Sequence, residues 1–165
     1  MALMLSGKSG KSLSKIYITY ILAVTIWNAL IFFTPYLASI DHPLYYLLYK
    51  FFSYTCHQDP SRSLFLFGNQ LPVCARDTAI YLGMLIGGLA LPLFADTTSK
   101  KVPPVLFLII AMIPIGIDGI TQLLGWRESI NTIRIITGGI IGLVIPFYLI
   151  PILNFFKYKF SRNKK

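Results

Sequence analysis

The sequence predicts an all-α integral membrane protein, a four-helix bundle with one further outer helical segment that is interfacial or re-entrant. The first observation is composition, because the 165 residues are 55% hydrophobic and 13% charged, with a mean hydropathy of +0.67. Soluble domains carry about 25% charged residues. The second observation is that the hydrophobic residues gather in four long runs with very few charges. This pattern excludes an ordinary soluble domain.

Each run is long enough to cross a membrane as a helix, which takes about 20 residues at a rise of about 1.5 Å each. The runs cover residues 16–40, 73–95, 102–124 and 130–156. The first run follows basic residues, as the core of a signal peptide does, but such a core has only about 7–15 residues. We therefore expect the first run to be retained as a membrane anchor.

Basic residues near the ends of the runs predict the orientation. Ten of the 15 Lys and Arg residues lie before the first run, between the second and third, or after the fourth. They are Lys8, Lys11, Lys15, Lys100, Lys101, Lys157, Lys159, Arg162, Lys164 and Lys165. The positive-inside rule places these segments in the cytoplasm. We expect a multi-pass plasma-membrane protein with a membrane domain over 16–156 and cytoplasmic basic tails over 1–15 and 157–165.

The net charge of +9 follows from this topology and from attraction to anionic lipids. Nucleic-acid binding would need basic residues interleaved with aromatic ones on a folded surface, and the tails lack that pattern. We therefore expect membrane lipids as partners, and no nucleic acid.

The segment between the first two runs, residues 41–72, is expected to cap the outer mouth of the bundle. Residues 44–54 are rich in Tyr, Phe and Leu but too few to cross the membrane, so a helix at the headgroup boundary is favoured. Asp59-Pro60 then breaks the chain, and a short apolar piece follows over 64–67. Residues 68–72 turn into the second run.

Ionisable residues inside the runs, among them Asp77, Asp118 and Arg134, predict a polar site. Each costs roughly 2.5–3.5 kcal/mol in hydrocarbon, and all three fall near the outer ends of the predicted helices. We expect them to share one layer, in which the two aspartates are catalytic or supporting acids and Arg134 orients an anionic group.

Small residues predict close helix packing just below that layer. Gly83 and Gly87 in the second run, and Gly138 and Gly142 in the fourth, each form a small-xxx-small pattern. We expect these patterns to join helices within the chain.

Four sequence blocks carry a family resemblance, namely CHQDPSRS, PVCARDTAIYLG, DGITQLLGWRES and NTIRIITGG. They resemble the signature blocks of a family of small predicted polytopic membrane proteins of unknown function, over residues 54–142. The resemblance implies that these positions act together in a membrane protein, and it implies no particular reaction.

The cysteines leave several interpretations open. Cys56, His57 and Cys74 are candidate ligands of a zinc-like metal, with Asp77 or Asp118 as a fourth ligand or a supporting group. Three protein ligands would leave a position for an activated water. Alternatively, Cys56 and Cys74 form a structural disulfide or exchange electrons with a quinone, although no Cys-x-x-Cys pair is present.

The candidate substrate-binding residues, which suit a phosphate or carboxylate, are Arg62, Arg76, Gln122 and Arg127. With the metal, they predict a hydrolase or transferase that acts on a lipid or other anionic headgroup at the outer leaflet. The alternatives are a non-catalytic scaffold, in which acids and arginines pair with one another, and a small transporter. Transport is less favoured, because the inner halves of the runs carry no continuous polar path.

Overall fold

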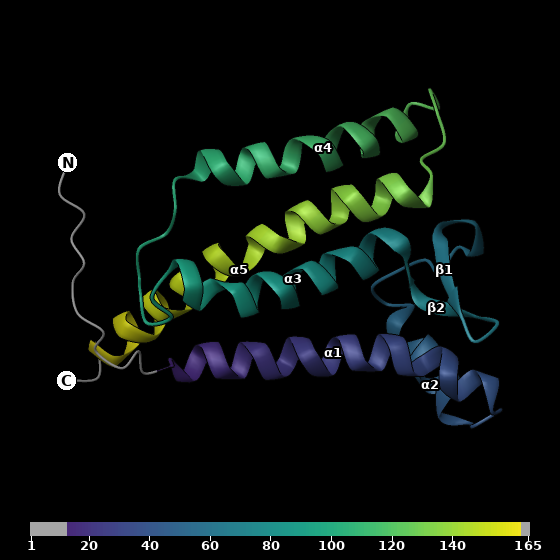
Figure 1. Cartoon of the computed structure of the whole chain (residues 1–165), viewed down its shortest axis with the longest axis horizontal. Helices are drawn as coiled ribbons and strands as arrows, with labels where there is room; N and C mark the ends of the chain where they lie inside the picture. The colour runs from purple at the N-terminus through teal and green to yellow at the C-terminus, as the bar shows by residue number, and fades with distance from the viewer. Residues whose placement is uncertain (1–12, 163–165) are drawn as a thin grey trace.

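The computed structural model describes residues 13–162 and contains four helices long and apolar enough to cross a membrane. They are α1 (Lys15–Ser39), α3 (Ala75–Phe94), α4 (Val105–Leu123) and α5 (Asn131–Arg162) (Figure 1). The predicted four-helix membrane protein is therefore confirmed. The basic residues expected in the tails before residue 13 and after residue 162 lie outside the described part of the chain.

The helix ends follow local signals in the sequence. α3 begins directly after Cys74, whose Sγ accepts a hydrogen bond from the backbone N–H of Asp77 (3.5 Å) and so caps the helix. α4 begins after Pro104 and ends shortly before Gly125, which has a φ of +70°. α5 continues beyond residue 156, where the fourth span was expected to end, as far as Arg162.

Glycines bring α3 and α5 into close contact. A Cβ on Gly87 would lie 2.3 Å from a backbone oxygen of α5, and a Cβ on Gly142 would lie 2.3 Å from a backbone oxygen of α3. Gly83 and Gly138 meet the opposite backbone in the same way, at 2.9 and 2.5 Å. The predicted small-residue packing therefore joins two helices of the same chain.

α1 packs on α3 and α5, whereas α4 contacts mainly α5. Tyr20 and Val24 of α1 form a buried cluster with Leu91 of α3 and Ile150 of α5. The Tyr20 hydroxyl also donates to the backbone oxygen of Met84 in α3 (2.9 Å). α4 runs along α5 at the edge of the bundle (Figure 1) and is the least buried of the spans.

The segment between α1 and α3 forms one end of the molecule (Figure 1). It contains α2 (Leu44–Phe52), the short helix η1 (Pro60–Arg62) and an antiparallel hairpin of β1 (Ser63–Leu66) and β2 (Asn69–Cys74). We call this the hairpin end. The terminal end, on the opposite side, consists of the start of α1, residues 95–104 and the end of α5.

The hairpin is the element that the sequence analysis did not anticipate, whereas α2 matches the expected aromatic helix. Phe67 and Gly68 join the strands with positive φ values of 53° and 75°, as a tight hairpin turn requires. The Gly-Asn pair between two apolar stretches was the available signal. Leu71 and Val73 of β2 are buried in a core shared with α1 and α2, which fixes the hairpin on the bundle.

Candidate functional site

Two glutamines attach the loop after α2 to the hairpin. Gln58 Nε2 donates to backbone oxygens of α2 and β2 (2.7 and 2.9 Å). Gln70 Nε2 donates in turn to the backbone oxygen of Gln58 (2.8 Å) and to the hydroxyl of Ser63 (2.9 Å). These bonds hold Cys56, in the loop, against the end of β2, where Cys74 lies.

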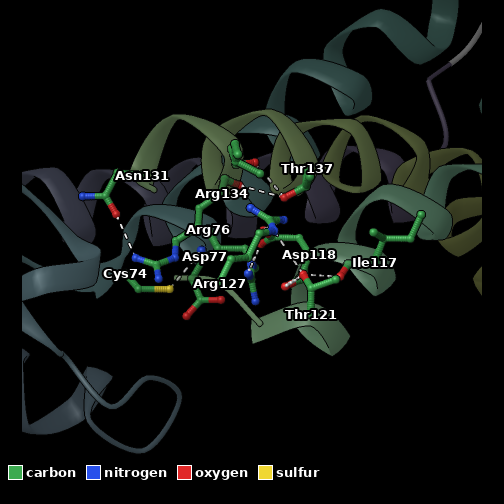
Figure 2. A network of polar contacts seen from close by, with 11 residues as sticks. Cys74, Arg76, Asp77, Ile117, Asp118, Thr121, Arg127, Asn131, Arg134 and Thr137 are labelled. Atoms are coloured by element: carbon green, nitrogen blue, oxygen red, sulfur yellow. Dashed lines mark hydrogen bonds and ion pairs between the residues drawn. The ribbon is translucent and has the colours of Figure 1, made fainter. Parts of the chain in front are cut away.

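The two cysteines meet where β2 passes into α3. The backbone N–H of Cys74 donates to Cys56 Sγ (3.2 Å). Asp77 follows within the first turn of α3, beside Cys74 (Figure 2). One ligand atom each from Cys56, Cys74 and Asp77 lies within 4.8 Å of the others, and both cysteines are free thiols.

The two thiols differ in acidity. The hydrogen bond from the Cys74 thiol lowers the pKa of Cys56 to about 7, against the opposing effect of burial. The same hydrogen bond, together with burial, raises the pKa of Cys74. Cys56 is thus the more acidic thiol of the pair.

A cavity of about 370 Å³ lies beside the sulfurs. It is lined by Thr55, Cys56, His57, Gln58, Asp59, Arg62, Cys74 and Asp77. His57 is exposed whereas Cys56 is 9% exposed, so the cavity extends from an accessible imidazole to a buried sulfur. Asp59 and Arg62 form an exposed ion pair on its wall (3.2 Å).

A second polar group lies at the hairpin end of α3, α4 and α5 (Figure 2). Asp118 of α4, which is 1% exposed, accepts hydrogen bonds from Arg76 of α3 and from Arg127, which follows α4 (2.8 Å to Arg127). Both contacts are ion pairs. One buried carboxylate therefore pairs with two guanidinium groups, and these three side chains together carry a net charge of +1.

Arg134 of α5 is a buried cation that forms no ion pair with an acidic residue among residues 13–162. It is 4% exposed and donates to Asn131 Oδ1 (3.1 Å). Arg62 and Arg76 are near enough to repel it and Asp118 is near enough to attract it, while Arg76 Nε is buried without a hydrogen-bond partner among the described residues. Because an unpaired buried charge is costly, this region favours an additional anion.

The layer expected for Asp77, Asp118 and Arg134 is divided between two groups in the structure. Asp77 lies with the cysteines at the cavity, whereas Asp118 forms ion pairs with Arg76 and Arg127. Within the described residues, no hydrogen bond or ion pair links Arg134 to either aspartate. All three side chains do lie at the hairpin end, as their positions near the helix ends predicted.

The other predicted site residues are also divided. Arg62 and His57 line the cavity, but His57 is not among the three mutually close ligand residues. Arg76 and Arg127 do not line it, because they bind Asp118. Gln122 lies partly exposed on α4, also outside the cavity lining.

The structure also gives roles to residues that the sequence analysis had not selected. Gln70 holds the loop that carries Cys56, and Asp59 lines the cavity. Asn28, buried in the middle of α1, donates to the backbone oxygen of Tyr81 in α3 (3.0 Å). Asn28 had a usable signal, because it is a polar residue in the middle of an apolar run, whereas the partners of Gln70 exist only after the hairpin has formed.

Comparisons with known proteins identify relatives. The family described as "Predicted membrane protein (DUF2085)" matches residues 56–148. An uncharacterized protein of Methanocaldococcus jannaschii is 39% identical over 153 residues, which cover 89% of this chain and 98% of the relative. An uncharacterized protein of Methanothermobacter thermautotrophicus is 41% identical over 87 residues, 53% of this chain and 77% of the relative. No solved structure matches the chain.

The family match begins at Cys56 and extends into α5, so it includes both polar groups described above. The resemblance of the four sequence blocks is therefore confirmed, and the chain belongs to the DUF2085 family of predicted membrane proteins.

Proposed function

We propose that the protein is a metal-dependent membrane enzyme, a hydrolase or transferase that acts on an anionic headgroup at the membrane boundary. The observation that carries this proposal is the group formed by Cys56, Cys74 and Asp77, whose ligand atoms lie within 4.8 Å of one another beside a cavity. Two sulfurs and a carboxylate oxygen are donors that zinc accepts.

Three protein ligands leave one position open on a tetrahedral ion. Catalytic zinc sites hold a water there and lower its pKa to about 7. Since the three ligand residues line the cavity, a water on the ion would face the space available to a substrate. We assign His57 to accept a proton from this water, because the imidazole lines the same cavity but is not one of the three mutually close ligand residues.

Two arginines of the hairpin end favour an anionic substrate. Arg62 lines the cavity, and the buried Arg134 takes part in no ion pair of the described residues. A phosphate or carboxylate bound beside Arg62 would gain from both cations. This supports a role for Arg134 in attracting the anionic group through its charge.

Exposed aromatic side chains favour a lipid as the source of that anion. Tyr54, directly before the cavity-lining loop, is 82% exposed, and Phe65 and Phe67 at the hairpin tip are 59% and 58% exposed. Aromatic side chains of this kind gather at the headgroup boundary of membranes. The cavity would then open at the depth of lipid headgroups.

The distribution of lysines supports the orientation proposed from the sequence. The described lysines of the terminal end are Lys15, Lys100, Lys101, Lys157 and Lys159. By the positive-inside rule this end would face the cytoplasm, and the hairpin end would lie at the outer face of the plasma membrane.

A thiol oxidoreductase is the second candidate, because both cysteines are free and their sulfurs lie within 4.8 Å. Oxidation of the pair would form the S–S bond and release two electrons and two protons, which would reduce a quinone to a quinol. Such an enzyme would consume quinone when reduced, whereas a zinc enzyme would not.

Metal analysis of the detergent-purified protein tests the main proposal. We expect close to one zinc per chain, lost in Cys56→Ser and Cys74→Ser and bound at least about tenfold more weakly in Asp77→Asn. Asp59→Asn is the matched control, because Asp59 lines the same cavity but is not one of the three ligand residues. It should keep its zinc.

Cobalt substitution tests the assignment of His57. We expect the sulfur-to-cobalt charge-transfer band to persist in His57→Ala and to be lost in Cys74→Ser. A metal-free wild-type protein, or equal metal loss in Asp59→Asn and Asp77→Asn, would contradict the proposal. Thermal unfolding of each variant separates loss of metal from loss of fold.

A further inference from the structure

A second cavity, an apolar groove of about 500 Å³, lies between α1 and α5 at the terminal end, far along the bundle from the cysteines. Lys15 and Lys157 line it together with apolar side chains that include Ile16, Ala23 and Leu153. Ala23 lies eight residues after Lys15, which is about 12 Å along a helix. The groove therefore extends from two cations near the helix ends into the apolar part of the bundle.

Hydrogen bonds fix the spacing of the two helices at this point. Ser14, directly before Lys15, donates from Oγ to Asn154 Oδ1 (3.1 Å). The amide of Asn154, one turn before Lys157, donates to the backbone oxygens of Thr97 and Ser99 (2.9 and 3.1 Å). Asn154 is buried. The two lysines are thus attached to a rigid junction of α1, the loop and α5.

The charges lining the groove have one sign. Neither lysine takes part in an ion pair of the described residues, and no acidic residue lines the groove. Two ammonium groups on one groove repel each other unless an anion lies between them. The site therefore combines attraction for an anion with walls that an apolar chain can contact.

A neighbouring groove at the same end gives a useful contrast. It contains Lys100 with Val102, Ile152, Phe155 and Phe156. The Lys100 Nζ lies 3.3 Å from the centre of the Tyr158 ring, so a cation–π contact already satisfies this ammonium. Of these two grooves, the one with Lys15 and Lys157 offers two cations that take part in no ion pair of the described residues.

We propose that the groove binds one anionic phospholipid, with the phosphate between Lys15 and Lys157 and an acyl chain along Ala23 and Leu153. A soluble anion would gain nothing from the apolar walls, and a second copy of the chain would bring its own lysines to this end. A lipid satisfies both features, since it presents a phosphate and a hydrocarbon chain together. This site is separate from the proposed metal centre and does not depend on it.

Native mass spectrometry of the full chain tests the proposal, with phosphatidylglycerol and phosphatidylcholine as probes. We expect retained phosphatidylglycerol, and a loss of its affinity by about tenfold or more in Lys15→Gln/Lys157→Gln. Lys101→Gln/Lys159→Gln removes the same charge from the same end without touching the groove. It should change the affinity less than about twofold.

Ala23→Trp is an independent test of the site, because it fills the apolar part of the groove and leaves every charge in place. We expect it to weaken phosphatidylglycerol binding while the melting temperature is preserved. Equal losses in the two double variants would overturn the site in favour of general attraction by the basic end. Equal retention of the two lipids by the wild-type chain, or unchanged binding in Ala23→Trp, would also overturn it.

Discussion

Arg76 of α3 forms an ion pair with the buried Asp118 of α4 and so ties the least buried span to the rest of the bundle. α4 otherwise packs mainly on α5. Arg127, which follows α4, binds the second oxygen of the same carboxylate at 2.8 Å. Asp118 therefore connects α3, α4 and the loop that leads to α5.

Replacing Asp118 with Ala is expected to destabilise the protein by about 3–5 kcal/mol, because two arginines then lose their shared anion. Arg127→Gln is the milder comparison. The Arg127 side chain is 38% exposed and the Arg76 contact survives, so we expect a loss of about 1 kcal/mol or less. Unfolding by denaturant in detergent measures both values. Equal losses would show that the buried pair does not hold α4.

Close packing of α3 and α5 predicts opposite effects for two Gly→Ala changes. In Gly87→Ala the new Cβ meets a backbone oxygen at 2.3 Å, so α5 must move, at a cost of about 1–3 kcal/mol. Gly116 of α4 has nothing within 4 Å of the corresponding position. Gly116→Ala should therefore be neutral or stabilising, by up to about 1 kcal/mol. Thermal unfolding measures both stability changes. If both substitutions destabilised the protein by similar amounts, the proposed close packing at Gly87 would be contradicted.

Gln70 is expected to position the metal ligands without touching the metal. Gln70→Ala removes the side-chain hydrogen bonds to Gln58 and Ser63 that hold the Cys56 loop on the hairpin. We expect zinc affinity to fall by about tenfold or more, with the thiols intact. Asn69→Ala is the control, because the Asn69 amide donates only within the turn, to the backbone oxygen of Phe67. A competitive chelator titration that gives identical affinities for both variants would refute this role.

The proposed orientation is tested by labelling in intact cells. In a Cys56→Ala/Cys74→Ala background, Tyr54→Cys at the hairpin end should react with an impermeant maleimide. Lys159→Cys at the terminal end should react only after lysis. The reverse pattern would place the basic end outside and remove the support for an outer-leaflet substrate.

The spans could be predicted almost completely, whereas the outer segment could not. Residues 102–124 were expected to cross the membrane, and α4 covers Val105–Leu123. By contrast, residues 63–74 form a hairpin where a short apolar piece and a turn were expected. Long apolar runs can be recognised from their composition, but a four-residue strand depends on the partner strand that gives it hydrogen bonds.

The candidate site was predicted in its residues more than in its contacts. Cys56, Cys74 and Asp77 were all selected, and the structure brings them together. The further grouping of Asp77 with Asp118 and Arg134 was an inference from depth. All three residues do lie near the helix ends at the hairpin end, yet position along a helix does not say in which direction around the helix axis a side chain points.

The four spans, and the positions of Asp77, Asp118 and Arg134 near one end of the helices, could be read from the chain alone, because length and hydrophobicity are properties of each run. Which charges meet depends on how the helices pack. Arg76 and Asp77 are neighbours in sequence but point about 100° apart around α3, so one binds Asp118 and the other lies with the cysteines. That choice depends on how α3 is rotated against its neighbours, and the close glycine contacts with α5 set this rotation.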